Sequence, residues 1–106
     1  MENTFRIGRF EELVLRAVWR LGENAYGVPI RREIADRTGR EYSVGAIYTA
    51  LDRLEQKGFV TSRLGHPTPE RGGRAKKYFR IEGTGIKALN YIEETIARMG
   101  GLIHVG

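Results

Sequence analysis

"SVGAIYTALDRLEQK", residues 43–57, predicts an amphipathic helix with a defined start and end. Ser43 can cap the first turn by accepting a hydrogen bond from a backbone N–H, and Gly58 lies where a left-handed residue often ends a helix. Apolar residues spaced three and four apart predict a buried stripe, which consists of Ile47, Leu51 and Leu54 with Ala50 beside it. The outward positions carry mostly small or polar side chains, which are Gly45, Ala46, Thr49, Asp52, Arg53 and Gln56, with Val44 and Tyr48 at the edges.

The residues that follow, "GFVTSRLGHPTPERGGRAKKYFRI" (58–81), predict a basic β-hairpin. Strands over 59–64 and 76–81 flank a loop over 65–75, which is too long for a tight hairpin turn. From Arg63 to Arg80 there are six Lys or Arg and one acid, so this segment has a net charge of +5. The whole chain also has a net charge of +5, so the hairpin holds all of the excess positive charge. That concentration favours an anionic partner, and a solvated loop without a partner is the alternative.

Two more helices are predicted before residue 43. The first covers about 9–21 and ends at Gly22, and the second has Pro29 in its first turn and ends near Thr38. The second and third helices are joined by a short turn that begins at Gly39, which is the pattern of a helix-turn-helix. We therefore expect a mainly α fold with a small antiparallel β-hairpin, that is, a winged helix-turn-helix.

A last helix is predicted from Gly83 or Thr84 to about Met99, with a narrow apolar seam of the kind that pairs helices. Leu15 and Trp19 lie one turn apart, opposite the broad apolar face of the first helix. We expect them to meet a C-terminal helix of this chain or of a partner. A wide core within one chain is equally consistent with the pattern. For Trp19, stacking against a ligand is a further alternative. The predicted dimer interface is Leu15, Trp19, Ile86, Leu89, Ile92, Ile96 and Met99.

Length and composition limit the possibilities further. A chain of 106 residues is expected to form one domain, with a winged-helix part over 1–82 and a dimerisation helix and tail over 83–106 in the same compact unit. The absence of cysteine removes disulfides, thiolate zinc sites and Cys nucleophiles, and His66 and His104 are too isolated to predict a metal site. No phosphate loop or acid–base pair is present, so we expect neither an enzyme nor a cofactor. The chain has no apolar membrane span or signal-like N-terminus, so a cytoplasmic location is expected.

A helix followed by a basic hairpin is typical of a reader of double-stranded DNA. Thr49 and Arg53 have side chains able to reach base edges, and Val44 and Ala46 are suited to a thymine methyl group. Tyr48 either donates to a phosphate or packs half-buried on the second helix, and Arg53 either faces the DNA or pairs with a group near Asp52 or Gln56. The predicted DNA-binding residues are Ser43, Val44, Gly45, Ala46, Tyr48, Thr49, Arg53, Arg63, Arg71, Gly72, Gly73, Arg74, Lys76 and Lys77.

Over residues 10–98 the chain resembles the PadR-like winged-helix transcriptional regulators. The matching motifs are Tyr26 with Gly27, Gly45 with Tyr48, Leu54 and Glu55 with Gly58, and Gly72, Gly73 and Arg74 before Lys77 and Tyr78. The chain differs from the family at Glu82 and Gly83, where a Thr-Pro pair is common, and it ends after one C-terminal helix. The resemblance implies a homodimeric repressor whose C-terminal helix pairs with that of its partner.

The predicted function is therefore sequence-specific regulation of transcription, as a repressor that binds an inverted-repeat operator as a homodimer. A dimer would place its two third helices about one helical turn, roughly 34 Å, apart on the duplex. The alternative is a winged-helix module that binds another protein and has no specific DNA site. The sequence identifies no small-molecule effector.

Overall fold

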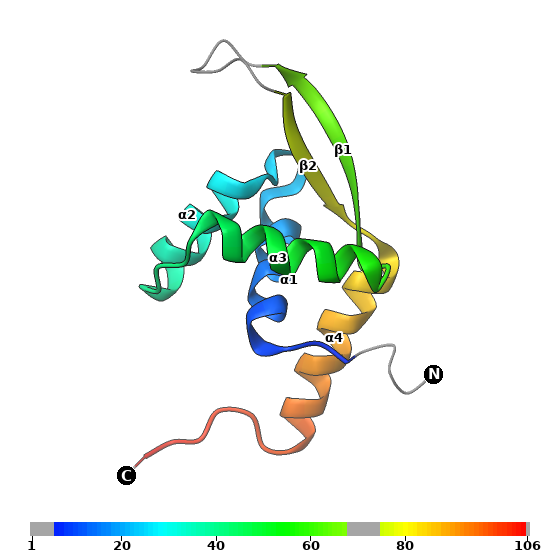
Figure 1. Cartoon of the computed structure of the whole chain (residues 1–106). Coiled ribbons are helices and arrows are strands. Elements are labelled where there is room, and N and C mark those ends of the chain that lie inside the picture. The colour runs from blue at the N-terminus through cyan, green and yellow to red at the C-terminus, as the bar shows by residue number, and fades with distance from the viewer. Residues whose placement is uncertain (1–5, 68–74, 106) are drawn as a thin grey trace.

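The computed structural model describes residues 6–67 and 75–105, and within them the chain is mainly helical (Figure 1). The predicted fold class, helices with one antiparallel hairpin, is confirmed. Arg71, Gly72, Gly73 and Arg74 lie outside the described residues. In chain order the elements are α1 (Arg9–Leu21), the short 3-10 turn η2 (Gly22–Asn24), α2 (Gly27–Thr38), α3 (Val44–Gln56), β1 (Val60–Pro67), β2 (Ala75–Ile81) and α4 (Gly83–Arg98).

The ends of α3 form as the sequence predicts. The Ser43 hydroxyl accepts a hydrogen bond from the backbone N–H of Ala46 at 3.0 Å, which satisfies one of the free donors of the first turn. At the other end, Lys57 caps the helix and Gly58 follows with φ 81°, a conformation that costs glycine little. The predicted start and stop of this helix are thereby confirmed.

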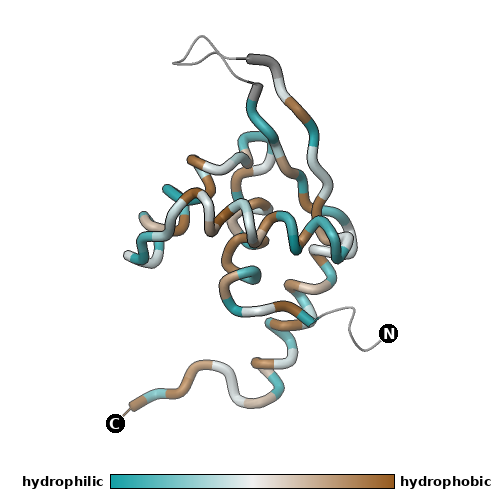
Figure 2. The backbone as a smooth tube through the Cα atoms, viewed as in Figure 1, coloured by the Kyte–Doolittle hydropathy of each residue, from teal (hydrophilic) through white to brown (hydrophobic). Residues whose placement is uncertain are grey.

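The core lies where α1, α2 and α3 meet the base of the hairpin and the first half of α4. The predicted stripe of α3, Ile47, Ala50, Leu51 and Leu54, is buried there. Figure 2 shows the hydrophobic segments gathered at the centre of the helices, and a second hydrophobic stretch at the C-terminal tail. The tail residues Leu102, Ile103 and Val105 are exposed. None of the helices that the structure describes is long and apolar enough to cross a membrane.

The hairpin is longer than predicted. β1 continues to Pro67, which pairs with Ala75, whereas the sequence suggested an end at Leu64. The register shifts between Leu64 and Pro67, which marks an irregularity in the ladder. The sequence predicts that Gly65 begins the loop, but a Cβ there would collide with the ring of Tyr78. Glycine at this position therefore makes room for a cross-strand tyrosine and does not end the strand.

Leu15 is buried in the core of this single chain together with Leu89 of α4. Of the alternatives for Leu15, the structure shows that it packs in the core of its own chain, in a cluster that includes the C-terminal helix of the same chain. The Arg16–Glu93 ion pair, at 3.0 Å, adds a polar link between α1 and α4. We therefore remove Leu15 and Leu89 from the predicted dimer interface, because fully packed side chains present no surface to a second chain. Trp19, in contrast, remains 48% exposed.

Candidate nucleic-acid interface

The outward face of α3 is open to solvent. Gly45, Thr49, Asp52, Arg53 and Gln56 are exposed, while Val44 and Ala46 are half-buried at its N-terminal end. The Thr49 hydroxyl donates a hydrogen bond to the backbone carbonyl of Gly45 at 3.1 Å. Since the one hydroxyl proton is used inside the helix, this side chain presents acceptor lone pairs outward.

Tyr48 packs against the second helix. Its hydroxyl oxygen accepts a hydrogen bond from the backbone N–H of Gly27 at 3.3 Å, and its ring centroid lies 6.3 Å from that of Phe79. A Cβ on Gly27 would lie 2.6 Å from Cε2 of Tyr48, so only glycine allows this approach. Of the two alternatives for Tyr48, the structure shows the half-buried packing role. Tyr48 thereby fixes α3 against the start of α2.

Replacing Gly27 tests this contact. We expect Gly27→Ala to lower the free energy of unfolding by about 1–3 kcal/mol, because the added methyl group overpacks a filled site. Gly45→Ala is the matched control, since Gly45 is also a first-turn helical glycine and its nearest contact for a Cβ is Ser43 Oγ at 3.9 Å. Alanine there should stabilise the helix slightly. Urea denaturation of both variants is the measurement, and equal stabilities would contradict the packing role.

Three cations of the hairpin, Arg63, Lys76 and Lys77, lie against aromatic rings. The Arg63 guanidinium is 4.8 Å from the ring centroid of Tyr78, and Lys76 Nζ is 5.6 Å from that of Tyr26. The two tyrosine rings are 5.1 Å apart, which joins the hairpin to the start of α2. Such cation–π contacts hold a charge in place while leaving it accessible. Sequence reasoning missed Tyr26 and Tyr78 as supports, although the basic pair followed by an aromatic pair in "KKYF" was a usable signal.

Hairpin and α3 together form one candidate interface. In Figure 1, α3 crosses the middle of the molecule in front of α1, and the hairpin extends away above it. Arg63 and Lys77 are exposed on the strands, and Lys76 is half-buried. This arrangement combines a helix with small outward side chains and a projecting ribbon that holds the chain's excess positive charge.

Glu11 is a functional candidate that the sequence analysis did not identify. It is the one charged residue that is buried among the described residues, with 8% exposure. Its carboxylate accepts hydrogen bonds from Lys57 Nζ at 2.7 Å and from the N–H of Gly8 at 3.4 Å. Arg53 Nη1 lies 3.7 Å from the same carboxylate. The alternative in which Arg53 pairs with a group near Asp52 or Gln56 is therefore corrected, because its ion-pair partner comes from α1.

The surroundings of Glu11 lower its pKa. Burial alone would raise the pKa of this carboxyl, but the hydrogen bonds from Lys57 and Gly8 and the charges of Lys57 and Arg53 bring it below its ordinary value. The unfolded chain therefore binds the proton more tightly than the folded chain does. The stability contributed by this carboxylate is present above the ordinary value of 4.5 and is lost as the pH falls through the lower folded pKa.

This linkage gives a prediction for acid conditions. The free energy of unfolding of the wild type should decrease as the pH is lowered from about 5 toward about 3, which is the interval around and below the ordinary carboxyl pKa. Glu11→Gln should be less stable at neutral pH and should show a shallower acid dependence. Urea titrations at several pH values measure both, and parallel curves for the two proteins would contradict the assigned pKa direction.

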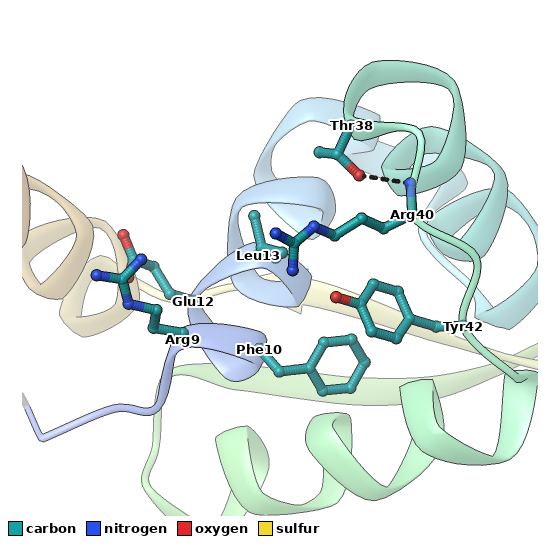
Figure 3. A pocket seen from close by; sticks show the side chains of 7 residues that line it. All are labelled: Arg9, Phe10, Glu12, Leu13, Thr38, Arg40 and Tyr42. Carbon is teal, nitrogen blue, oxygen red and sulfur yellow. Dashed lines mark hydrogen bonds between the residues drawn. The ribbon is translucent and has the colours of Figure 1, made fainter. Parts of the chain in front are cut away.

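The described surface has several hollows. The one drawn in Figure 3 has a volume of about 510 Å³ and lies between the start of α1 and the α2–α3 turn. Phe10 and Tyr42 line it, with ring centroids 4.5 Å apart, and the Arg40 side chain extends along it. The described residues contain no group of three or more His, Cys, Asp or Glu placed to hold a metal ion.

A winged helix-turn-helix with a basic hairpin defines the class of protein. Within that class, the model of the Transcriptional regulator PadR-like family matches residues 14–91, and the chain belongs to this family. The predicted membership is confirmed. The chain is thus a PadR-family transcriptional regulator, which implies regulation through DNA binding, and the family is one of regulators and not of enzymes.

Solved structures support the fold. A PadR family transcription regulator from Clostridium difficile R20291 has a TM-score of 0.70 at 21% identity, with 87% of this chain and 91% of that chain covered. A PadR-like transcription factor from Bacteroides fragilis has a TM-score of 0.72 at 18% identity, with coverages of 92% and 89%. A PadR family transcriptional regulator from Eggerthella lenta has a TM-score of 0.66 at 26% identity, with coverages of 86% and 77%. A search of curated protein sequences returned no match.

Proposed function

We propose that this chain is a repressor that binds an inverted-repeat operator as a homodimer. The observation that carries the proposal is the exposed face of α3 beside a hairpin that contains all of the chain's excess positive charge. A helix of this diameter fits the major groove of B-DNA, and a basic ribbon next to it can follow the sugar–phosphate backbone. Bound near a promoter, such a dimer would compete with transcription initiation.

Sequence reading is assigned to the outward face of α3, from its first turn to Arg53 in its last turn. Thr49 presents acceptor lone pairs, so it suits the N–H groups of adenine or cytosine. Arg53 has a fork of donors that suits guanine, and its side chain is 65% exposed. Ser43, Gly45 and the half-buried Val44 and Ala46 line the helix end that would approach most closely.

Affinity is assigned mainly to the hairpin. Arg63, Lys76 and Lys77 lie on its strands, and the sequence adds Arg71 and Arg74 between them. Contacts of these side chains with phosphates would release condensed counterions, so binding should weaken steeply with salt. Tyr48 is assigned a supporting role, since its ring and hydroxyl are engaged with Phe79 and Gly27.

The proposed dimer surface consists of the apolar side chains that the single chain leaves uncovered. On α4, Ile96 is 54% exposed, Ile86 is also exposed and Ile92 is half-buried. Met99, the C-cap of α4, is 82% exposed, and Trp19 of α1 lies beside Ile86 and Leu89. Exposed apolar side chains gathered along one helix are typical of an interaction site. A second copy of α4 is the partner that the narrow seam suits best.

The alternative function is a module that binds another protein through the same fold. It would leave the hairpin cations dispensable, and its binding would depend little on salt. The proximity of exposed α3 and the basic ribbon favours the DNA-binding proposal.

A footprint on the DNA upstream of the chain's own coding sequence tests the proposal. We expect two protected half-sites of inverted sequence, with centres about 10 base pairs apart or a multiple of that spacing. Uniform protection that shows no preferred position, from a protein that is dimeric in solution, would argue against it. A promoter reporter that is unchanged by expression of the chain would rule out repression at that site.

A further inference from the structure

Arg53 has an unusual environment for a side chain assigned to a base edge. Its guanidinium lies on the outward face of α3, and 65% of the side chain is exposed. Its ion-pair partner, Glu11, comes from the first turn of α1, 42 positions earlier in the sequence. Nη1 and the carboxylate oxygen are 3.7 Å apart, which is ion-pair distance but longer than a hydrogen bond. The guanidinium is therefore attracted to Glu11 without committing its N–H donors to it.

The carboxylate of Glu11 is itself firmly held. Lys57 Nζ donates to Oε1 at 2.7 Å and also to the backbone carbonyl of Arg6 at 3.0 Å. The N–H of Gly8 donates to the same Oε1 at 3.4 Å, so Oε2 is the atom that faces Arg53. Lys57 is the C-cap of α3, so one buried acid connects the start of α1 with two turns of the recognition helix.

We propose that Glu11 is a positioning residue for DNA sequence selectivity, which orients the Arg53 guanidinium on the outward face of α3. This inference rests on the proposed function. The carboxylate limits the directions that a long, flexible arginine can take, and ordering before binding reduces the entropy lost when Arg53 docks on a base pair. The same negative charge weakens the attraction of Arg53 to phosphates. Since phosphate contacts are independent of sequence, weakening them favours selectivity.

Glu11→Gln is the informative substitution, because glutamine keeps the shape of the side chain and removes the charge. Glu33→Gln is the matched control. Glu33 also bridges two cations, Arg20 at 2.7 Å and Arg37 at 2.6 Å, but it does so between α1 and α2. Both variants remove one negative charge, and both are compared at a temperature where denaturation curves show them fully folded.

The first measurement is the ratio of affinities for a selected duplex and for a scrambled duplex. We expect Glu11→Gln to bind scrambled DNA a few-fold more tightly and to lose about tenfold of its preference, comparable to the loss of one bidentate base contact. In an Arg53→Ala background, Glu11→Gln should cause no further loss of preference. A purely structural role would instead weaken both duplexes alike. The proposal is overturned if Glu11→Gln retains the preference of Glu33→Gln, or if its effect persists without Arg53.

The second measurement needs no DNA. The NMR signal of the Arg53 Nε–H group should show restricted motion in the wild type and in Glu33→Gln, and free motion in Glu11→Gln. Equal mobility in all three proteins would overturn the positioning role. A wild-type chain without preference for any duplex would overturn the proposed function instead, and the Arg53 signal would still decide whether Glu11 orders this side chain.

Discussion

Reversing the charge of Arg63 and Lys77 should weaken binding to every duplex, whatever its sequence, by about 100-fold at low salt. Both side chains are exposed on the hairpin, and each lies over an aromatic ring that holds it in place. Arg63→Glu with Lys77→Glu would remove two of the proposed phosphate contacts and add two repulsions. The plot of log affinity against log salt should become shallower by about two units or more, since each lost contact removes about 0.9. Fluorescence anisotropy at several salt concentrations measures both quantities.

The control for this variant changes the same amount of charge elsewhere. Lys87 and Arg98 are exposed on α4, on the side of the helix away from the apolar seam. Lys87→Glu with Arg98→Glu should reduce affinity only slightly, with the salt slope nearly unchanged. If the two double variants lose affinity equally, the overall charge of the protein governs binding, and the hairpin has no special role.

Placing charges on the exposed end of the α4 seam should separate the proposed dimer into monomers. Ile96→Glu with Met99→Glu puts two carboxylates where a second chain is expected to bury apolar surface. Because both side chains are already exposed in the single chain, its own core should stay intact. Specific DNA affinity should fall by at least about 100-fold, because the second half-site is no longer bound within the same complex. Binding to scrambled DNA should change much less.

Sedimentation equilibrium and denaturation curves accompany this experiment. The expected result is a monomer with near-wild-type thermal stability at low protein concentration. The Lys87→Glu, Arg98→Glu variant again provides the control, because it changes α4 on its other face and should remain dimeric. A dimer that survives the Ile96 and Met99 substitutions would place the interface on another surface.

Much of the fold was predictable because its signals are local. Ser43 and Gly58 delimit α3 through hydrogen bonding and backbone conformation that depend on a few neighbouring residues. The spacing of Ile47, Leu51 and Leu54 follows from the helical repeat, and the net charge of the hairpin follows from counting. These features lie in short windows of sequence, where propensity and periodicity are informative.

The rest depended on contacts between distant segments. Gly65 has the appearance of a turn residue until the ring of Tyr78 is placed across from it. Leu15 is off the main apolar stripe of α1, yet it is buried in the same core cluster as Leu89 of α4. Glu11 has the pattern of a surface acid in a first turn, and only the packing of α1 against α3 brings it to Lys57 and Arg53. No local rule connects residues 42 or more positions apart, so such partners appear only in three dimensions.

Sequence-specific DNA binding is the central claim, and a competition titration tests it most directly. The wild-type protein is bound to a labelled duplex from the DNA upstream of its own coding sequence, and unlabelled duplexes of that sequence and of a scrambled sequence compete for it at physiological salt. The upstream duplex should bind more tightly by a factor of at least about 1,000, the lower end of the range for specific regulators. Equal competition by the two duplexes, with the dimer shown to be intact, would contradict the claim.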